Sequence, residues 1–454
     1  MKSILIVDDD VAVTNYFMVF LMQTEMFDVV VENDSRNVEG LLKDGDFDLM
    51  LLDMDMPNIS GMEILRRLRA RGDDLPVIIL TGVSDVDLAV RSMKLGAFDY
   101  LVKPVDDDSL LEVIENAVEH NALHQSIEQL PSELSRESLD NEAAFEGFPT
   151  LDPKMIRVLH QAEKMAESDL SIFIWGEPGT GKEALARSIH GASPRSDGPF
   201  IAVEADSHPP DEVPAFLFGQ ARVYGGEKQA APGVLEEAEG GTLFIDKIEA
   251  LSVPVQVRLK RVIQTDEYYR ESSARIRKAD VRFIVSSTKD LTRPEYRDSF
   301  SQDLLFHLMV NPVRIPPLRE RPEDIPLLAR HLLEREVART GRGIQGFDDD
   351  FLELLKGYPF PDNMQELRNI VAMAVVNEES ERITLDSLSS YVRSRIAPEA
   401  GGDSEVRTME QVMRDHAKDV LQHCEGDRER VASVLEIPRE ELDRLLPPEE
   451  EEED

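Results

Sequence analysis

Two sets of residues in this 454-residue chain have the types and spacing needed for phosphate chemistry. The first is a glycine-rich segment with the spacing G-x-x-x-x-G-K. Its glycines let backbone N–H groups curve around an anion, a following helix adds partial positive charge, and the lysine reaches terminal phosphates. We therefore expect ATP or ADP to bind through this loop. Its residues are Gly176, Glu177, Gly179, Thr180, Gly181, Lys182 and Glu183.

The second set lies in the first 120 residues, where polar side chains directly follow four apolar runs. Clustered carboxylates suit a hard divalent cation such as Mg²⁺. A hydroxyl and a lysine beside them suit the oxygens of a phosphoryl group. The implied reaction is transfer of a phosphoryl group onto a carboxylate. The residues in question are Asp8, Asp9, Asp53, Thr81 and Lys103.

Alternating strands and helices must position both sets. Five apolar runs with helical stretches between them predict a doubly wound parallel sheet, whose strand ends gather ligands at one edge. These runs are 3–7, 29–31, 49–52, 77–80 and 99–102. The glycine-rich loop likewise follows the apolar run Leu170–Trp175 and precedes the helical stretch Ala184–Ile189. A further strand ends in Asp246, which predicts the carboxylate on the magnesium side of a nucleotide site.

Composition limits the remaining possibilities. The formal charge of −40 argues against a nucleic-acid surface along the whole chain, because phosphates would be repelled. The single cysteine, Cys424, excludes an internal disulfide and a cysteine metal cluster. No run is long and apolar enough for a signal peptide or a membrane span, so we expect a cytoplasmic protein without a membrane partner.

Residues 1–120 resemble the receiver domain of bacterial response regulators. The resemblance rests on the Asp-Asp pair, on the segment from Asp53 to Pro57 followed by Gly61, on Thr81, and on Lys103-Pro104. It implies that Asp53 is the phosphoacceptor, that Asp8 and Asp9 hold Mg²⁺ with it, and that Thr81 and Lys103 contact the phosphoryl group. It also implies a sensor histidine kinase as partner.

Residues 148–396 resemble the AAA+ domain of sigma-54-dependent transcription activators of the nitrogen-regulator type. The matching pieces include the glycine-rich loop, the segment 199–203, the segment 217–219, the strand 240–246 and the segment 316–321. Glutamate after the loop lysine is normal in this family. The resemblance implies self-association into dimers or hexamers.

Several departures from that family remove groups needed for hydrolysis. The family glutamate that polarises the attacking water is replaced by Lys247, which is not a base at neutral pH. Two arginines that reach the neighbouring subunit's nucleotide are replaced by Ser301 and His307, and one such arginine contributes about three to five orders of magnitude in rate. Thr288 stands for an asparagine, and Gln365 for a phosphate-sensing arginine. We expect bound nucleotide, hydrolysed very slowly, with Lys247 free to pair with the γ-phosphate.

The two output contacts of the family also differ. The sigma-gripping loop G-A-F-T-G-A is replaced by the segment 220–227, which lacks its Phe-Thr pair. The C-terminal stretch resembles a helix-turn-helix, but 405–446 contains 7 basic and 11 acidic residues, and the acidic tail 449–454 follows. A recognition helix must approach phosphates. Both features argue against contacts with sigma-54 polymerase and with DNA, although Arg439 and Arg444 leave a residual DNA role open.

The predicted fold class is α/β, with a doubly wound receiver, an AAA+ P-loop domain with a helical lid, and a small all-α C-terminal domain. The predicted boundaries are 1–120 for the receiver, 121–147 for a helical and acidic linker, 148–396 for the AAA+ domain with its lid from about 345, 397–407 for a second linker, 408–447 for the helix-turn-helix and 448–454 for the tail. The main hypothesis is a response regulator with a hydrolysis-impaired AAA+ output domain. The alternatives are a working sigma-54-dependent activator and an ATPase that acts outside transcription.

Overall fold

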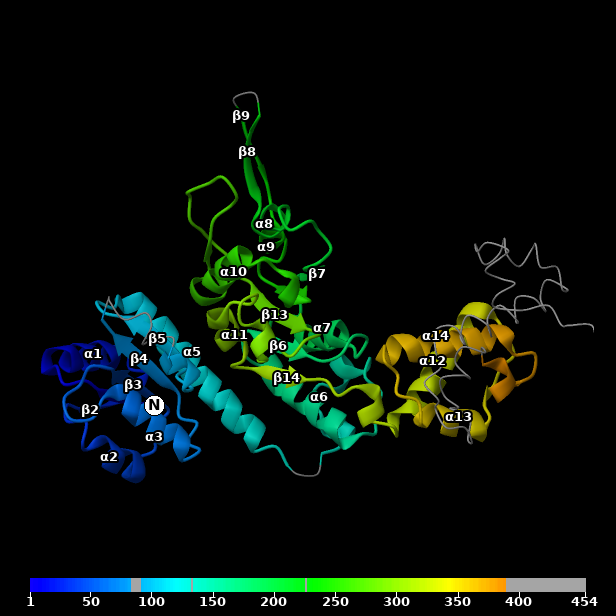
Figure 1. The fold of residues 1–454 in the computed structure, drawn as a ribbon, viewed down its shortest axis with the longest axis horizontal. Coiled ribbons are helices and arrows are strands. Elements are labelled where there is room, and N and C mark those ends of the chain that lie inside the picture. The colour runs from blue at the N-terminus through cyan, green and yellow to red at the C-terminus, as the bar shows by residue number, and fades with distance from the viewer. Residues whose placement is uncertain (83–90, 132–133, 225–226, 389–454) are drawn as a thin grey trace, which may run out of the picture. The chain divides into compact units, whose positions relative to one another are not determined.

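The structure is a computed structural model that describes residues 1–82, 91–131, 134–224 and 227–388, without the side chains of 222–230. Figure 1 traces these residues from the first sheet to the lid helices. The predicted helix-turn-helix and acidic tail lie outside the described residues. Among the residues described, no helix has the length and apolar character that crossing a bilayer requires.

The N-terminal part is a five-stranded parallel sheet in the order β2-β1-β3-β4-β5, as the alternating pattern predicted. Strands β3 and β4 are buried along their whole length, which explains their unbroken apolar runs. Helix α5 begins where the Asp106 side chain accepts a hydrogen bond from the Ser109 N–H, at 2.9 Å. The elements are β1 (Lys2–Val7), α1 (Val11–Gln23), β2 (Phe27–Glu32), α2 (Val38–Asp44), β3 (Leu49–Asp53), α3 (Gly61–Ala70), β4 (Val77–Thr81), β5 (Asp99–Val102) and α5 (Asp107–Glu128).

A second parallel sheet follows, in the order β14-β6-β13-β10-β7. Helix α6 begins at Pro153 after Asp152, whose carboxylate accepts hydrogen bonds from two backbone N–H groups. The elements are α6 (Pro153–Ala166), β6 (Ile172–Trp175), α7 (Lys182–Ala192), β7 (Phe200–Glu204), α8 (Val213–Phe218), α9 (Val234–Glu237), β10 (Thr242–Asp246), the 3₁₀ turn η3 (Ile248–Ala250), α10 (Val253–Thr265), β11 (Glu267–Tyr268), β12 (Arg277–Lys278), β13 (Arg282–Ser287), the 3₁₀ turn η4 (Pro294–Tyr296), α11 (Gln302–Leu308) and β14 (Pro312–Arg314).

An antiparallel ribbon occupies the place of the family's sigma-contacting loop. Strands β8 (Gln220–Tyr224) and β9 (Glu227–Ala231) pair from Gln220 opposite Ala231 to Tyr224 opposite Glu227. The ribbon extends from the neighbourhood of α8 and α9 (Figure 1). The segment 220–227, which lacks the Phe-Thr pair of the family loop, thus lies in this ribbon.

The lid is helical, as predicted, but its first helix begins earlier than residue 345. Helix α12 (Asp324–Thr340) packs on α14 and α13, and Asp324 at its start is fully buried. Its carboxylate accepts hydrogen bonds from the Thr150 hydroxyl and from the backbone of Leu151, both at 2.7 Å. The remaining lid elements are the 3₁₀ turn η5 (Leu318–Glu320), β15 (Gly346–Phe347), α13 (Asp349–Lys356), α14 (Asn363–Asn377), β16 (Arg382–Ile383) and the 3₁₀ turn η6 (Leu385–Ser387).

The segment predicted as an acidic linker contains structured core residues. It forms two 3₁₀ turns, η1 (Arg136–Ser138) and η2 (Glu142–Phe145). Phe145 is fully buried and Leu139 nearly so, in one cluster with apolar residues of α6 and α7. The helix α5 reaches the same cluster through Leu123. Residues 139–148 are therefore part of the AAA+ core rather than a free connector.

This packing yields a stability prediction. Phe145→Ala is expected to lower the free energy of unfolding by about 3–5 kcal/mol, because a fully buried ring is removed and a cavity remains. Chemical denaturation followed by tryptophan fluorescence measures the change. The adjacent exposed Glu146→Ala serves as the control and should change stability by less than about 0.5 kcal/mol. Equal, small effects of the two substitutions would show that the segment does not pack on the core.

Candidate functional site

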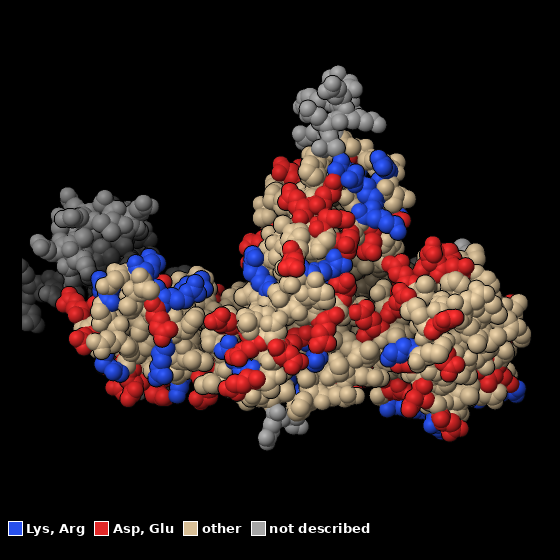
Figure 2. Space-filling view, turned by 180° about the vertical axis from the view of Figure 1, so that it is seen from behind, with Lys and Arg blue, Asp and Glu red and all other residues tan. Residues whose placement is uncertain are grey.

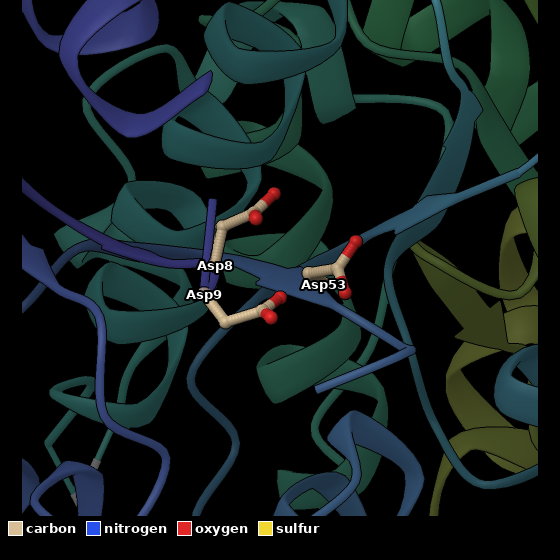
Figure 3. Close-up of side chains that lie close together, drawn as sticks. All are labelled: Asp8, Asp9 and Asp53. Carbon is tan, nitrogen blue, oxygen red and sulfur yellow. The ribbon is translucent and has the colours of Figure 1, made fainter. Parts of the chain in front are cut away.

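The first site is an acidic pocket at the carboxyl edge of the receiver sheet. Asp8 and Asp9 follow β1, and Asp53 ends β3 beside it. Asp8 and Asp53 are buried, whereas Asp9 is exposed. Figure 3 shows the three carboxylates clustered, and their ligand oxygens lie within 4.8 Å of one another. The sheet thus brings together the three acids that the sequence predicted as metal ligands.

Lys103 and Thr81 complete this pocket from the next two strands. The Lys103 ammonium lies 2.6 Å from a carboxylate oxygen of Asp8 and also donates to Asp53. Thr81 is buried at the end of β4, and its carbonyl accepts the Lys103 N–H at 2.8 Å. Burial alone lowers the pKa of Lys103, but hydrogen bonds to Asp53 and Asp8 outweigh it and raise that pKa. Burial raises the pKa of Asp8, against the lowering effect of Lys103.

The geometry of this pocket fits a bound Mg²⁺ ion. Asp8, Asp9 and Asp53 supply the hard oxygen ligands that Mg²⁺ prefers. One oxygen of Asp53 accepts the backbone N–H of Asp55 at 2.8 Å, which fixes the orientation of its carboxylate. A β-carbon on Gly61 would lie 2.2 Å from the Asp53 carbonyl oxygen, so glycine is required beside the strand end. When bound, Mg²⁺ would neutralise the charge on an incoming phosphoryl group.

The second site is the glycine-rich loop between β6 and α7. Gly179 and Gly181 have φ values of +73° and +100°, which glycine adopts without strain. The buried Lys182 begins α7 and donates to the carbonyl oxygens of Gly176 and Glu177, at 3.1 and 3.2 Å. The buried Thr180 donates its hydroxyl to the Glu177 carbonyl at 2.8 Å. Glu183 instead points to solvent and pairs with Arg187 at 2.7 Å. The loop therefore has the left-handed glycines and the helix start at Lys182 that a phosphate cradle needs, and phosphate binding there stays a prediction.

The lid holds this loop through residues whose role sequence reasoning missed. Arg319 forms a two-pronged ion pair with the Glu177 carboxylate, with the longer contact at 2.6 Å. The Asn363 amide donates to the Pro178 carbonyl at 2.9 Å and accepts the Leu318 N–H at 2.7 Å. Two sequence signals existed for the contact between Arg319 and Glu177. One was the glutamate inside the glycine-rich loop, and the other was the separate arginine-rich segment.

Asp246 lies at the end of β10, but Lys247 turns away from it. Asp246 accepts a hydrogen bond from the Ser286 hydroxyl on β13. Lys247 has a left-handed backbone, φ +55°, and its ammonium lies 2.8 Å from Asp206 and 3.5 Å from Glu204. The hydrogen bond to Asp206 raises the pKa of Lys247, so it is a cation. Asp206 and Glu204 would therefore compete with a γ-phosphate for the ammonium group of Lys247.

A glutamate that the sequence analysis did not single out contacts the residue that follows β13. Glu249, in η3, accepts hydrogen bonds from the Thr288 N–H at 3.1 Å and from the Thr288 hydroxyl at 2.7 Å. Thr288 follows β13 directly, and β13 lies between β6 and β10 in the sheet. The only sequence signal was an acid two positions beyond Lys247.

The substituted hydrolytic positions have ordinary structural surroundings. Ser301 caps α11, where its hydroxyl accepts the Leu304 N–H at 3.3 Å. His307 is mostly buried on the same helix, and burial lowers its pKa, which favours the neutral ring. Gln365 at the start of α14 lies over the loop, with its β-carbon 3.5 Å from where a β-carbon on Gly179 would be. None of these three side chains carries a positive charge of the kind the family uses.

These features define a receiver domain joined to an AAA+ nucleotide-binding domain with a helical lid. Family models agree along the chain: a response regulator receiver domain matches residues 4–115, a sigma-54 interaction domain 149–314 and an AAA+ ATPase lid domain 319–404. The chain is 33% identical over 441 residues to the transcriptional regulatory protein ZraR of Escherichia coli K12, covering 97% of each. It is 32% identical over 450 residues to the DNA-binding transcriptional regulator NtrC of Rhizobium meliloti, covering 96% of this chain and 90% of that protein.

The chain therefore belongs to the sigma-54-dependent response regulators. A solved structure of NtrX from Brucella abortus in complex with ADP is also similar. It has 26% sequence identity and a TM-score of 0.52, and the match covers 98% of this chain and 99% of that one.

The receiver pocket yields a prediction about the phosphoacceptor. Asp53→Asn is expected to abolish phosphorylation by a small acyl phosphate in the presence of Mg²⁺, because the amide cannot form the acyl phosphate. Intact-mass measurement of the full chain would detect one added phosphoryl group. Asp55→Asn is the matched control, since Asp55 is exposed and contributes only its backbone N–H to Asp53. Undiminished labelling of the Asp53→Asn protein would place the phosphoacceptor elsewhere.

The glycine-rich loop yields a second prediction. Gly179→Ala is expected to weaken ATP binding by about tenfold or more, because distorting the loop misplaces the N–H groups that contact phosphate. The added β-carbon would lie 2.2 Å from the Asp362 carbonyl and would require a positive φ. Titration with a fluorescent ATP analogue measures the affinity. Gly191→Ala, whose added β-carbon meets nothing within 4 Å, is the control and should bind normally.

Proposed function

We propose that this chain is a transcription regulator in which phosphorylation of Asp53 by a sensor histidine kinase controls a nucleotide-bound AAA+ domain that hydrolyses ATP slowly. The observation that carries the first half is the buried pairing of Lys103 with Asp8 and Asp53 at the edge of the receiver sheet. Phosphorylation would place a new anion between Lys103, Thr81 and the metal ligands. The ion pairs of Lys103 with Asp8 and Asp53 would then rearrange. Such a local change of charge can shift a receiver domain between two conformations.

The surroundings of Lys247 support slow hydrolysis. This side chain occupies the position where the family has its water-polarising glutamate, and here it is held by Asp206 and Glu204. Ser301 and His307 stand where the family has two arginines, and loss of one such arginine costs about three to five orders of magnitude in rate. The nucleotide would then serve mainly to organise the domain and its self-association.

A second candidate function is a working sigma-54-dependent activator with ATPase activity and DNA binding. The relatives favour it, since those compared above are named as transcriptional regulators and match this chain over nearly its whole length. The β8–β9 ribbon, at the position of the sigma-contacting loop, also favours it. An ATPase acting outside transcription is the third candidate, and the receiver together with these relatives counts against it.

Surface charge bears on DNA as a partner. Figure 2 shows acidic side chains spread over the visible face of the described residues, with basic ones among them. Together with the net charge of −40, this makes DNA binding through the described part unfavourable. Any DNA contact would fall to the C-terminal segment, whose own charge is negative.

A turnover measurement separates the two leading candidates. The purified full chain with Mg–ATP is expected to bind nucleotide yet turn over well below about one per second, the lower end of ordinary enzymes. A mock preparation from cells that lack this chain, purified identically, measures contaminating ATPase activity. Turnover of about one per second or faster would favour the working activator and overturn our proposal. Repeating the assay with an acyl-phosphate mimic on the receiver shows whether phosphorylation changes it.

A further inference from the structure

The position of Glu249 is set by the backbone immediately after β10. The left-handed conformation at Lys247 sends that side chain toward Asp206 and starts the 3₁₀ turn η3. The chain then turns back, so that the Glu249 carboxylate meets the backbone and hydroxyl of Thr288. The two charged residues, only two positions apart, thus face different neighbours.

The sheet order places this carboxylate inside the nucleotide site. Strand β13 lies between β6, which leads into the glycine-rich loop, and β10, which ends in Asp246. A group held at the end of β13 therefore lies between the phosphate cradle and the magnesium-side aspartate. The charge of Glu249 acts on the lysine of the glycine-rich loop. Burial lowers the pKa of Lys182, while Asp246 and Glu249 both act to raise it.

One carboxylate oxygen of Glu249 is available to accept a proton. Oε1 accepts both hydrogen bonds from Thr288, whereas Oε2 is buried and has no hydrogen-bond partner among the residues that the structure describes. A buried carboxylate oxygen without a hydrogen-bond partner is destabilising, so it calls for a ligand. Because the hydrogen bonds from Thr288 fix Oε1, they also fix the position of Oε2 beside the predicted phosphate site.

We propose that Glu249 is the general base for the residual ATP hydrolysis of this chain, in place of the residue at position 247. This inference rests on the proposed function, in which the loop binds ATP. Glu249 Oε2 takes a proton from a water molecule while the water oxygen forms a bond to the γ-phosphorus. The bond from the γ-phosphorus to the bridging oxygen breaks, and its electron pair leaves with ADP. Phosphate and ADP are the products, and Glu249 releases its proton to solvent.

Thr288 acts in this scheme as a positioning residue. Its N–H and hydroxyl both hold Oε1, so that only Oε2 can accept the proton. Lys247 cannot replace Glu249, because it is a cation paired with Asp206. The carboxylate that acts as the general base is therefore supplied by the turn after β10 rather than by the end of that strand.

The test compares Glu249→Gln with wild type in the full chain. Glutamine keeps an oxygen that accepts from Thr288 but cannot take a proton, so folding and ATP binding should be unchanged. Single-turnover release of γ-phosphate, measured with protein in excess over ATP, is expected to slow about 100-fold, as on loss of a general base. Titration with a fluorescent ATP analogue should give the same affinity for both proteins. Glu237→Gln, an exposed acid of α9, is the control for loss of one charge and should leave the rate unchanged.

The outcomes distinguish this inference from the function on which it rests. Equal γ-phosphate release by the wild type and Glu249→Gln would overturn the inference, and so would a wild type that binds ATP but never hydrolyses it. In both cases slow, nucleotide-bound function would stand. A wild type that does not bind ATP would overturn the proposed function and this inference together. A rate loss accompanied by an equal loss of affinity would show that Glu249 only shapes the site, which also contradicts the inference.

Discussion

The parallel order of strands is the constraint on which both sites depend. In a parallel sheet all carboxyl ends meet one edge, so residues far apart in sequence converge there. In the receiver this edge gathers Asp8, Asp53 and Lys103 from β1, β3 and the end of β5. In the AAA+ sheet it gathers the loop after β6, Thr288 after β13 and Asp246 on β10. Chemistry in each domain is therefore built on short segments that follow the strands of a parallel sheet.

Buried like charges at these edges explain the role of the two lysines. Asp8 and Asp53 are nearly buried and close together, and two carboxylates so placed repel each other unless a cation lies between them. Lys103 supplies that cation in this structure. Lys182 has the opposite problem, because its own burial disfavours its charge. The carboxylates of Asp246 and Glu249 offset that effect only in part, so the pKa of Lys182 stays below its usual value.

The strands and helices that position the sites could be predicted, because they follow from local periodicity and strand ends. The five receiver strands and the loop between β6 and α7 lie where the apolar runs placed them. The fate of individual side chains could not be predicted in the same way. Lys247 was expected to be able to reach a γ-phosphate, yet a left-handed residue and two carboxylates from β7 and the loop after it hold it elsewhere. The segment around Phe145 was predicted as a linker because it is polar on average, although a few apolar residues within it complete a core formed by distant helices.

The same reasoning changes how the substitution at position 247 should be understood. A lysine in place of the family glutamate after β10 would add a positive charge to the phosphate site if its side chain pointed into that site. Here Asp206 and Glu204 pair with that cation, and its charge still acts to lower the pKa of Lys182. The inner site keeps Lys182 opposed by Asp246 and Glu249, which is one ammonium among two carboxylates. The position of a charge after folding, rather than its place in a motif, therefore decides whether this domain retains its chemistry.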